Sequence, residues 1–184
     1  DELEEVLRRV RKIIEENKEI VRRVLEDVKR SVEELERHTE RVLREAKRLA
    51  DELEDARRKI ERKEDLARLV EEVKREVTRL IKENKDKIRK VNEDNRKLIE
   101  ELKKINDDSK RTIDELIRDL DRRRRDEEVK RVAKELRELL ERSNREVRRV
   151  VEEIKKLNDE VRKKSEEMRR RIEKLLEELE RKVK

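Results

Sequence analysis

The apolar residues of this chain recur every three or four positions and form three long stripes. The first runs from Leu3 to Ile60, the second from Leu66 to Leu120, and the third from Val129 to Val183. A repeat of this period places the apolar side chains on one face of an α-helix. The stripes therefore predict three helices, at about residues 2–62, 66–121 and 127–183. At ~1.5 Å per residue, each would be on the order of 85 Å long.

Short interruptions separate the stripes. Lys63 and Glu64 stand where the first stripe should continue, and the second stops at the charged run from Asp121 to Glu128. Connections this short force successive helices to run in opposite directions. The apolar face covers about three of every seven positions, which suits a helix packed against two neighbours. We therefore expect an all-α fold, a single-chain antiparallel three-helix bundle that forms one domain over residues 1–184.

The phase of the stripes predicts how strongly the helices coil around one another. One row of apolar residues keeps a step of seven, but its companion row shifts by one residue near His38, Leu80 and Val150. A strict seven-residue repeat demands a full left-handed supercoil, whereas a straight helix drifts by about 20° per heptad. The partial shift predicts long, gently supercoiled helices.

Charged residues mark the same boundaries. Acidic residues stand at the three predicted starts and basic residues at the three predicted ends, where each complements the helix dipole. The acids are Asp1, Glu2, Glu64, Asp65, Asp126, Glu127 and Glu128, and the bases are Arg57, Arg58, Lys59, Arg122–Arg125, Arg181 and Lys182. Asp65 and Asp126 are expected to cap their helices by accepting from unpaired backbone amides.

Composition excludes several classes of protein. Charged residues make up 61% of the chain and hydrophobic residues 31%, with no aromatic residue, Gly, Pro or Cys. No segment alternates with the period of a β-strand, and no apolar run is long enough for a membrane span or a signal peptide. We therefore expect no membrane partner and find no targeting signal, so the localisation is left open.

The charge pattern argues against nucleic acid as a partner. The net charge of +6 comes from 59 basic and 53 acidic residues that are mixed along the whole length. Proteins that bind nucleic acid concentrate basic residues on one face or in one arm. The one basic block, Arg122–Arg125, is interpreted as the closing charge of a helix.

The chain carries few residues suited to catalysis or to cofactor binding. Di-metal helical bundles need Glu-x-x-His on two helices, but here His38 is the one histidine and Leu35 stands three residues before it. No Gly-rich loop exists to cradle a phosphate, and no serine is placed by spacing beside His38 with an orienting acid. We expect no metal, no other cofactor and no enzymatic activity.

Uncharged polar residues fall on the apolar stripes or beside them. In an antiparallel pair that turns near residue 63, facing residue numbers sum to about 126, and for the second pair the sum is about 252. This register predicts three polar layers, and their members are Asn17/Ser109/Ser143, Ser31/Asn95/Asn158 and His38/Thr39/Asn84/Ser165. Several polar groups at one height can bond one another, and a shifted helix would leave them facing apolar residues. The alternative is that each is a tolerated substitution bonded to its own backbone.

His38 is expected to belong to the third layer. It is the side chain whose ordinary pKa, about 6.5, lies between pH 5 and 8. Burial would lower that pKa, whereas pairing with Glu34, one turn earlier, would raise it.

These features resemble those of parametrically designed helical bundles with buried hydrogen-bond networks. The resemblance covers the whole chain and is carried by the layers Asn17/Ser109/Ser143 and Ser31/Asn95/Asn158. It implies a structural scaffold with no natural substrate. The positions outside the apolar stripes are nearly all charged and leave no second apolar face for another subunit, so we expect a monomer without a required partner.

Two other functions are weighed against the scaffold. A subunit of a designed homo- or hetero-oligomer, with designed partner helices, would turn apolar residues outward. The candidates at the stripe edges are Val6, Ile13, Leu69, Ile99, Ile117 and Leu176. An extended natural-type coiled coil is disfavoured by the two interruptions, at residues 61–65 and 121–128.

Overall fold

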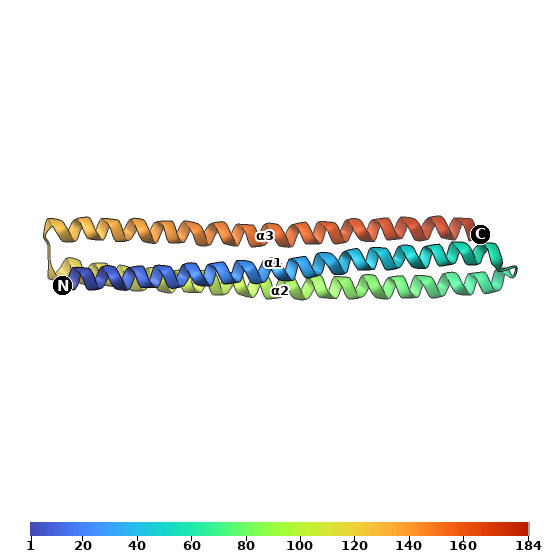
Figure 1. Cartoon of the computed structure of the whole chain (residues 1–184), viewed down its shortest axis with the longest axis horizontal. Helices are drawn as coiled ribbons and strands as arrows, with labels where there is room; N and C mark the ends of the chain where they lie inside the picture. The colour runs from blue at the N-terminus through green and yellow to red at the C-terminus, as the bar shows by residue number, and fades with distance from the viewer. Residues whose placement is uncertain (184) are drawn as a thin grey trace. The chain divides into compact units, whose positions relative to one another are not determined.

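The computed structural model describes residues 1–183 and consists of three long α-helices (Figure 1). Helix α1 spans Glu2–Lys59, α2 spans Lys63–Arg123 and α3 spans Glu127–Val183. Together they hold 96% of the chain, and residues 1–183 contain no β-strand. The prediction of an all-α fold with three helices is confirmed.

The chain divides into two compact units, and each helix contributes to both. Unit 1 comprises Asp1–Lys29 and Asp94–Lys156, and unit 2 comprises Arg30–Glu93 and the residues from Leu157 onward. That residues 1–184 form one domain stays a prediction.

Unit 1 is built around a core to which all three helices contribute. Its fully buried members include Val10 of α1, Ile113 of α2 and Leu136 of α3. Between α1 and α2, Arg123 lies 3.5 Å from Glu2, and Asn17 bonds Ser109 further along. Numbers that rise on α1 fall on α2, as they do in neighbouring helices that run in opposite directions.

Unit 2 has a core of the same kind. Leu53, Val77 and Ile172 are almost completely buried in it and come from α1, α2 and α3. Side chains of Glu36 and Lys164 form one ion pair between α1 and α3, and those of Glu54 and Lys182 form another. These numbers rise together, so α1 and α3 run in the same direction in this unit.

On α2 the core includes Ile99, which the sequence places at the edge of the stripe. Leu98 is only partly buried, whereas its neighbour Ile99 is 6% exposed and belongs to the core. A step of seven from Val77 and Asn84 would lead through Val91 to Leu98, but the buried row continues at Ile99 instead. This is the drift of a helix that does not follow a strict heptad.

The turns between helices need no glycine. Three residues, 60–62, join α1 to α2, and residues 124–126 join α2 to α3. No residue of the described chain has a positive φ. Glycine is favoured in turns because it adopts positive φ at no steric cost, and turns without positive φ can be built from other residues.

Only one of the two predicted helix caps is present. Asp126 Oδ1 accepts a hydrogen bond of 3.0 Å from the Val129 amide, and this bond lowers the pKa of Asp126. The prediction for Asp65 is wrong because α2 begins at Lys63, which places Asp65 inside the first turn. There it complements the helix dipole but cannot act as the cap.

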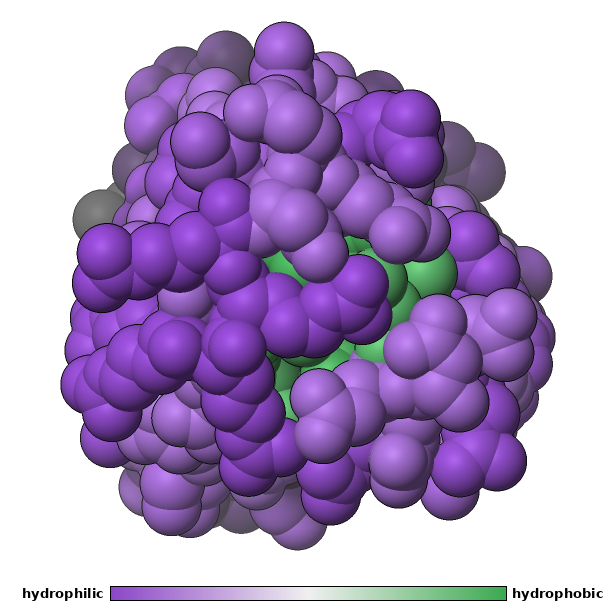
Figure 2. All heavy atoms as spheres, turned by 90° about the vertical axis from the view of Figure 1, so that its left-hand side faces the viewer, coloured by the Kyte–Doolittle hydropathy of each residue, from purple (hydrophilic) through white to green (hydrophobic). Residues whose placement is uncertain are grey.

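Charged residues cover the exposed faces and often pair within one helix. The sequence Glu-x-x-Arg-x-x-x-Glu occurs four times with its arginine bridging both acids, centred on Arg22, Arg48, Arg79 and Arg149. Figure 2 shows the result on one end face, where hydrophilic residues surround a small central area of apolar atoms.

Replacing the one observed cap should cost more than replacing the acid beside it. We expect Asp126→Ala to lower the guanidinium denaturation midpoint, because the amide of Val129 loses its partner. Asp65→Ala is the control: it removes a charge from a first turn without removing a cap, and its midpoint should change less. Equal midpoints for the two variants would contradict the capping assignment.

Candidate functional site

A polar cluster around Asn84 in unit 2 receives one or more residues from each helix. The Asn84 side chain is 0% exposed, and Thr39 of α1 and Ser165 of α3 are buried beside it. His38 of α1 is partly buried at its edge. The structure therefore brings together all four residues of the third predicted layer.

Every hydrogen-bonding group of the Asn84 amide has a partner. Its nitrogen Nδ2 lies 3.0 Å from Thr39 Oγ1 and 3.0 Å from His38 Nδ1. Its oxygen Oδ1 accepts from the Ser165 hydroxyl at 2.7 Å. A buried amide left without partners is costly, and this arrangement avoids that cost with protein groups alone.

These bonds fix the tautomer of His38. The Thr39 hydroxyl donates to the Leu35 carbonyl at 2.9 Å, so its oxygen must accept from Asn84 Nδ2. That nitrogen only donates, and its second hydrogen points to His38 Nδ1. Nδ1 is therefore the acceptor, and the proton of the neutral imidazole is on Nε2.

The environment of His38 favours this neutral form. Burial lowers the pKa of His38, and the positive charges of Lys87 and Arg41 lower it further. Glu83 acts in the opposite direction but does not reverse the shift. The alternative in which Glu34 raises this pKa is wrong, because burial first, and then the charges of Lys87 and Arg41, lower it.

The first predicted layer is only partly assembled. Asn17 Nδ2 donates to Ser109 Oγ at 2.7 Å, so these two residues meet across α1 and α2 of unit 1. Ser143 is buried, but within the described residues it makes no hydrogen bond to either of them. The Ser143 hydroxyl extends only one bond beyond Cβ. The residue lines a hollow together with Ile14 and Val21.

The second predicted layer stays a prediction. Ser31 and Asn158 belong to unit 2 and Asn95 to unit 1. Asn95 is 1% exposed, while Ser31 and Asn158 are partly buried. Asn95 and Asn158 each have a polar partner.

Some uncharged polar residues lie outside any layer. Thr112, which was expected on the stripe, is exposed and donates to the Asp108 carbonyl of its own helix at 3.0 Å. Asn144 keeps its Oδ1 buried without a hydrogen-bond partner among the described residues. For Thr112 the tolerated-substitution interpretation holds.

The chemistry available at the Asn84 cluster is limited. His38 is the one titratable member of the cluster, and the other members contribute an amide and two hydroxyls. Among residues 1–183 no group of three or more His, Cys, Asp or Glu side chains could hold a metal ion. None of the helices described has a segment apolar enough, over sufficient length, to span a membrane. What the cluster does is bond three helices together.

Removing the Asn84 amide should destabilise the protein. Asn84→Ala leaves the Ser165 hydroxyl and His38 Nδ1 without their partner and opens a cavity, so we expect a loss of about 2–3 kcal/mol. Asn92→Ala is the matched control, because Asn92 is partly buried on the same helix outside the layers. Its free energy of unfolding should change by less than about 0.5 kcal/mol. Equal losses would show that the network contributes nothing.

The His38 pKa should lie below 6.5 in the folded protein and can be measured by NMR titration of the one imidazole. Folding disfavours the protonated form of His38. The contribution of neutral His38 to the free energy of unfolding is therefore complete above the unfolded pKa of about 6.5. It is lost as the pH falls through the folded pKa. Lys87→Gln should bring the folded pKa closer to 6.5, since it removes a positive neighbour. A wild-type pKa above 6.5 would contradict the assignment of Nδ1 as acceptor.

Comparison with known proteins yields a match in fold. No protein-family model and no curated protein matches the sequence. Among solved structures, a chain described as a computationally designed three-helix bundle is 19% identical, with a TM-score of 0.64. The alignment covers 99% of this chain and 95% of the other. At that identity the similarity shows the fold alone, which is a three-helix bundle.

Proposed function

We propose that this chain is a designed structural scaffold without a natural substrate, in which buried polar residues select one register of the three helices. The observation that carries the proposal is the Asn84 amide, which is bonded to side chains of α1 and α3 on all of its polar atoms. The chain would act as a monomer, without catalytic activity, cofactor, nucleic acid or required partner.

A polar network is suited to this role because it is costly when misaligned. If α3 moved by one heptad, Ser165 would leave Asn84, and the buried amide oxygen would face apolar side chains instead. An apolar core discriminates less between registers, because leucine, isoleucine and valine can substitute for one another in packing with small losses. The layer thus adds specificity where apolar packing adds mainly stability.

The network matters most for the register between α1 and α3. Turns of three residues join α1 to α2 and α2 to α3, and such turns already restrict sliding within those pairs. No turn joins α1 directly to α3. Thr39 and Ser165 come from these two helices and meet at Asn84, so the network supplies a constraint that the turns lack.

Disulfide trapping tests the register between α1 and α3. Glu36 and Lys164 form an ion pair of 3.2 Å, and Arg171 lies one heptad beyond Lys164 on the same helix. In the native background we expect the pair Glu36→Cys/Lys164→Cys to oxidise in preference to the pair Glu36→Cys/Arg171→Cys. One heptad moves the second cysteine about 10 Å along the helix axis, which is farther than a disulfide can bridge. Adding Thr39→Val, Asn84→Leu and Ser165→Ala should allow the second pair to oxidise as well.

A destabilised control separates register from stability. Leu53→Ala removes core contacts from the same unit and leaves the network intact, so it should not allow the shifted disulfide. The proposal fails if the variant without the network also forms only the native disulfide. In that case apolar packing and the turns alone would set the register.

The alternative of an oligomer subunit has lost the residues that suggested it. Of the six stripe-edge candidates, Ile99 and Ile117 are buried, and Val6, Ile13, Leu69 and Leu176 are partly buried against the cores of their units. No large hydrophobic side chain of residues 1–183 is exposed. A helical partner that binds through apolar contacts would have little to bury here, which favours the monomer.

A further inference from the structure

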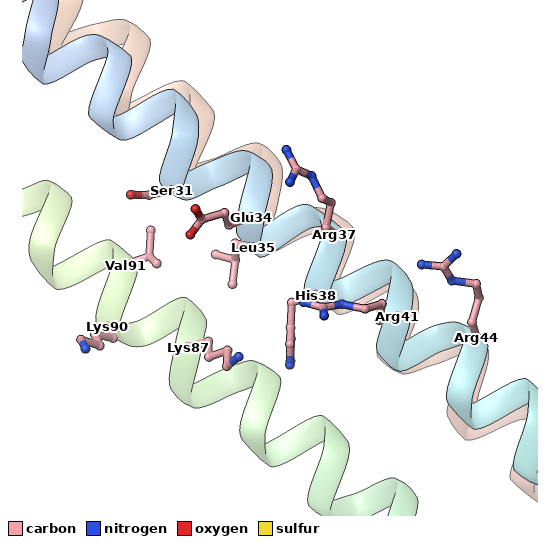
Figure 3. A pocket seen from close by; sticks show the side chains of 10 residues that line it. All are labelled: Ser31, Glu34, Leu35, Arg37, His38, Arg41, Arg44, Lys87, Lys90 and Val91. Carbon is pink, nitrogen blue, oxygen red and sulfur yellow. The ribbon is translucent and has the colours of Figure 1, made fainter.

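A hollow of about 560 Å³ lies beside His38 in unit 2, between α1 and α2 (Figure 3). Basic side chains dominate its walls. Those that line it, together with His38, are Arg37, Arg41, Arg44, Lys87 and Lys90. Glu34 is the one acidic residue of the lining.

Like charges face each other across this hollow. Arg41 comes from α1 and Lys87 from α2, and neither forms an ion pair with any carboxylate in the described chain. The contacts that α3 makes with the other helices of unit 2 include opposite charges, as in Glu36–Lys164 and Lys74–Glu180. The α1–α2 side at His38 departs from that pattern.

Nearby acids do not neutralise the hollow. Glu83 already pairs with Arg79 on its own helix at 3.4 Å. Glu33 offsets one basic residue of the lining, Arg37, at 3.6 Å, which leaves Arg41 and Lys87 without an acidic partner among the described residues. The excess positive charge is felt at His38, where Lys87 and Arg41 both oppose protonation. A partner of opposite sign would relieve this repulsion.

The side chains that reach into the gap can supply donors to such a partner. In Figure 3, His38 extends from α1 into the gap, and Lys87 extends into it from α2. Because His38 Nδ1 is occupied by Asn84, its proton is on Nε2, and no hydrogen bond within the described chain uses that N–H. Arg41 adds a planar donor group, and Lys87 adds an ammonium group, both of which suit phosphate oxygens.

We propose that this hollow binds a small multivalent oxyanion of the phosphate class, held by Arg41, Lys87 and the Nε2–H group of His38. The site is independent of the scaffold function, since it would remain if the polar layers had no effect on register. Two cations flank one neutral donor, so an anion with two or more charges is preferred over chloride.

Calorimetry and NMR with inorganic pyrophosphate test the site. At pH 7.5 and constant ionic strength, we expect one saturable site on the native protein and a shift of the His38 ring signals that saturates with it. Arg41→Gln/Lys87→Gln should weaken binding about tenfold, as expected for the loss of two charge-assisted contacts. Glu34→Gln should strengthen binding by about threefold, because it removes the one acid of the lining.

A control variant with the same net charge as Arg41→Gln/Lys87→Gln tests whether anions bind only through the overall positive charge of the protein. Arg8→Gln/Lys12→Gln removes the same two charges from exposed positions of unit 1 and should bind pyrophosphate as the native protein does. The proposal is overturned if both double variants lose affinity equally. It is also overturned if the native protein shows no saturable binding, or if the His38 signals do not move.

Discussion

The side-chain amide of Asn84 has no access to water, so all of its hydrogen bonds must come from the protein. That requirement fixes much of what surrounds it. A hydroxyl that can donate must face its oxygen, and Ser165 provides it. Two acceptors must face its nitrogen, and Thr39 and His38 provide them. Three helices are thereby held at one relative height by one side chain.

The polar pairs between α1 and α2 could be predicted from the sequence, because a short turn fixes which residues of the two helices face each other. Once a turn is placed near residue 63, Asn17 must lie near Ser109, and Thr39 near Asn84, and the structure has both pairs in hydrogen-bonding contact. The prediction needed only the period of the stripe and the position of one interruption. It did not depend on the loop conformation, which is why a small error in the start of α2 did no harm.

What could not be predicted depends on side-chain reach and on single residues of phase. Ser143 is buried and lines a hollow with Ile14 and Val21, but its short side chain makes no hydrogen bond to Asn17 or Ser109. Ile99 replaces Leu98 in the core because the helix drifts against the heptad, and adjacent apolar residues hide that shift in the sequence. Asp65 looked like a cap because acids suit both the cap and the first turn. The basic hollow was missed as well, since it requires knowing which charges face each other.

The basic hollow beside His38 results from the way in which charged side chains pair within each helix. Arginines such as Arg79 pair with acids of their own helix at spacings of three and four residues. An acid used in this way is not free for the neighbouring helix, so a run of like charges can remain across a groove.

His38 belongs both to the buried polar network and to the lining of the basic hollow. Its Nδ1 completes the interior network, while its ring lines a hollow rich in positive charge. Protonation of Nδ1 would set one donor against another at Asn84 and add a further charge to that hollow. Both effects act in the same direction, so the network and the surface field each hold this histidine neutral.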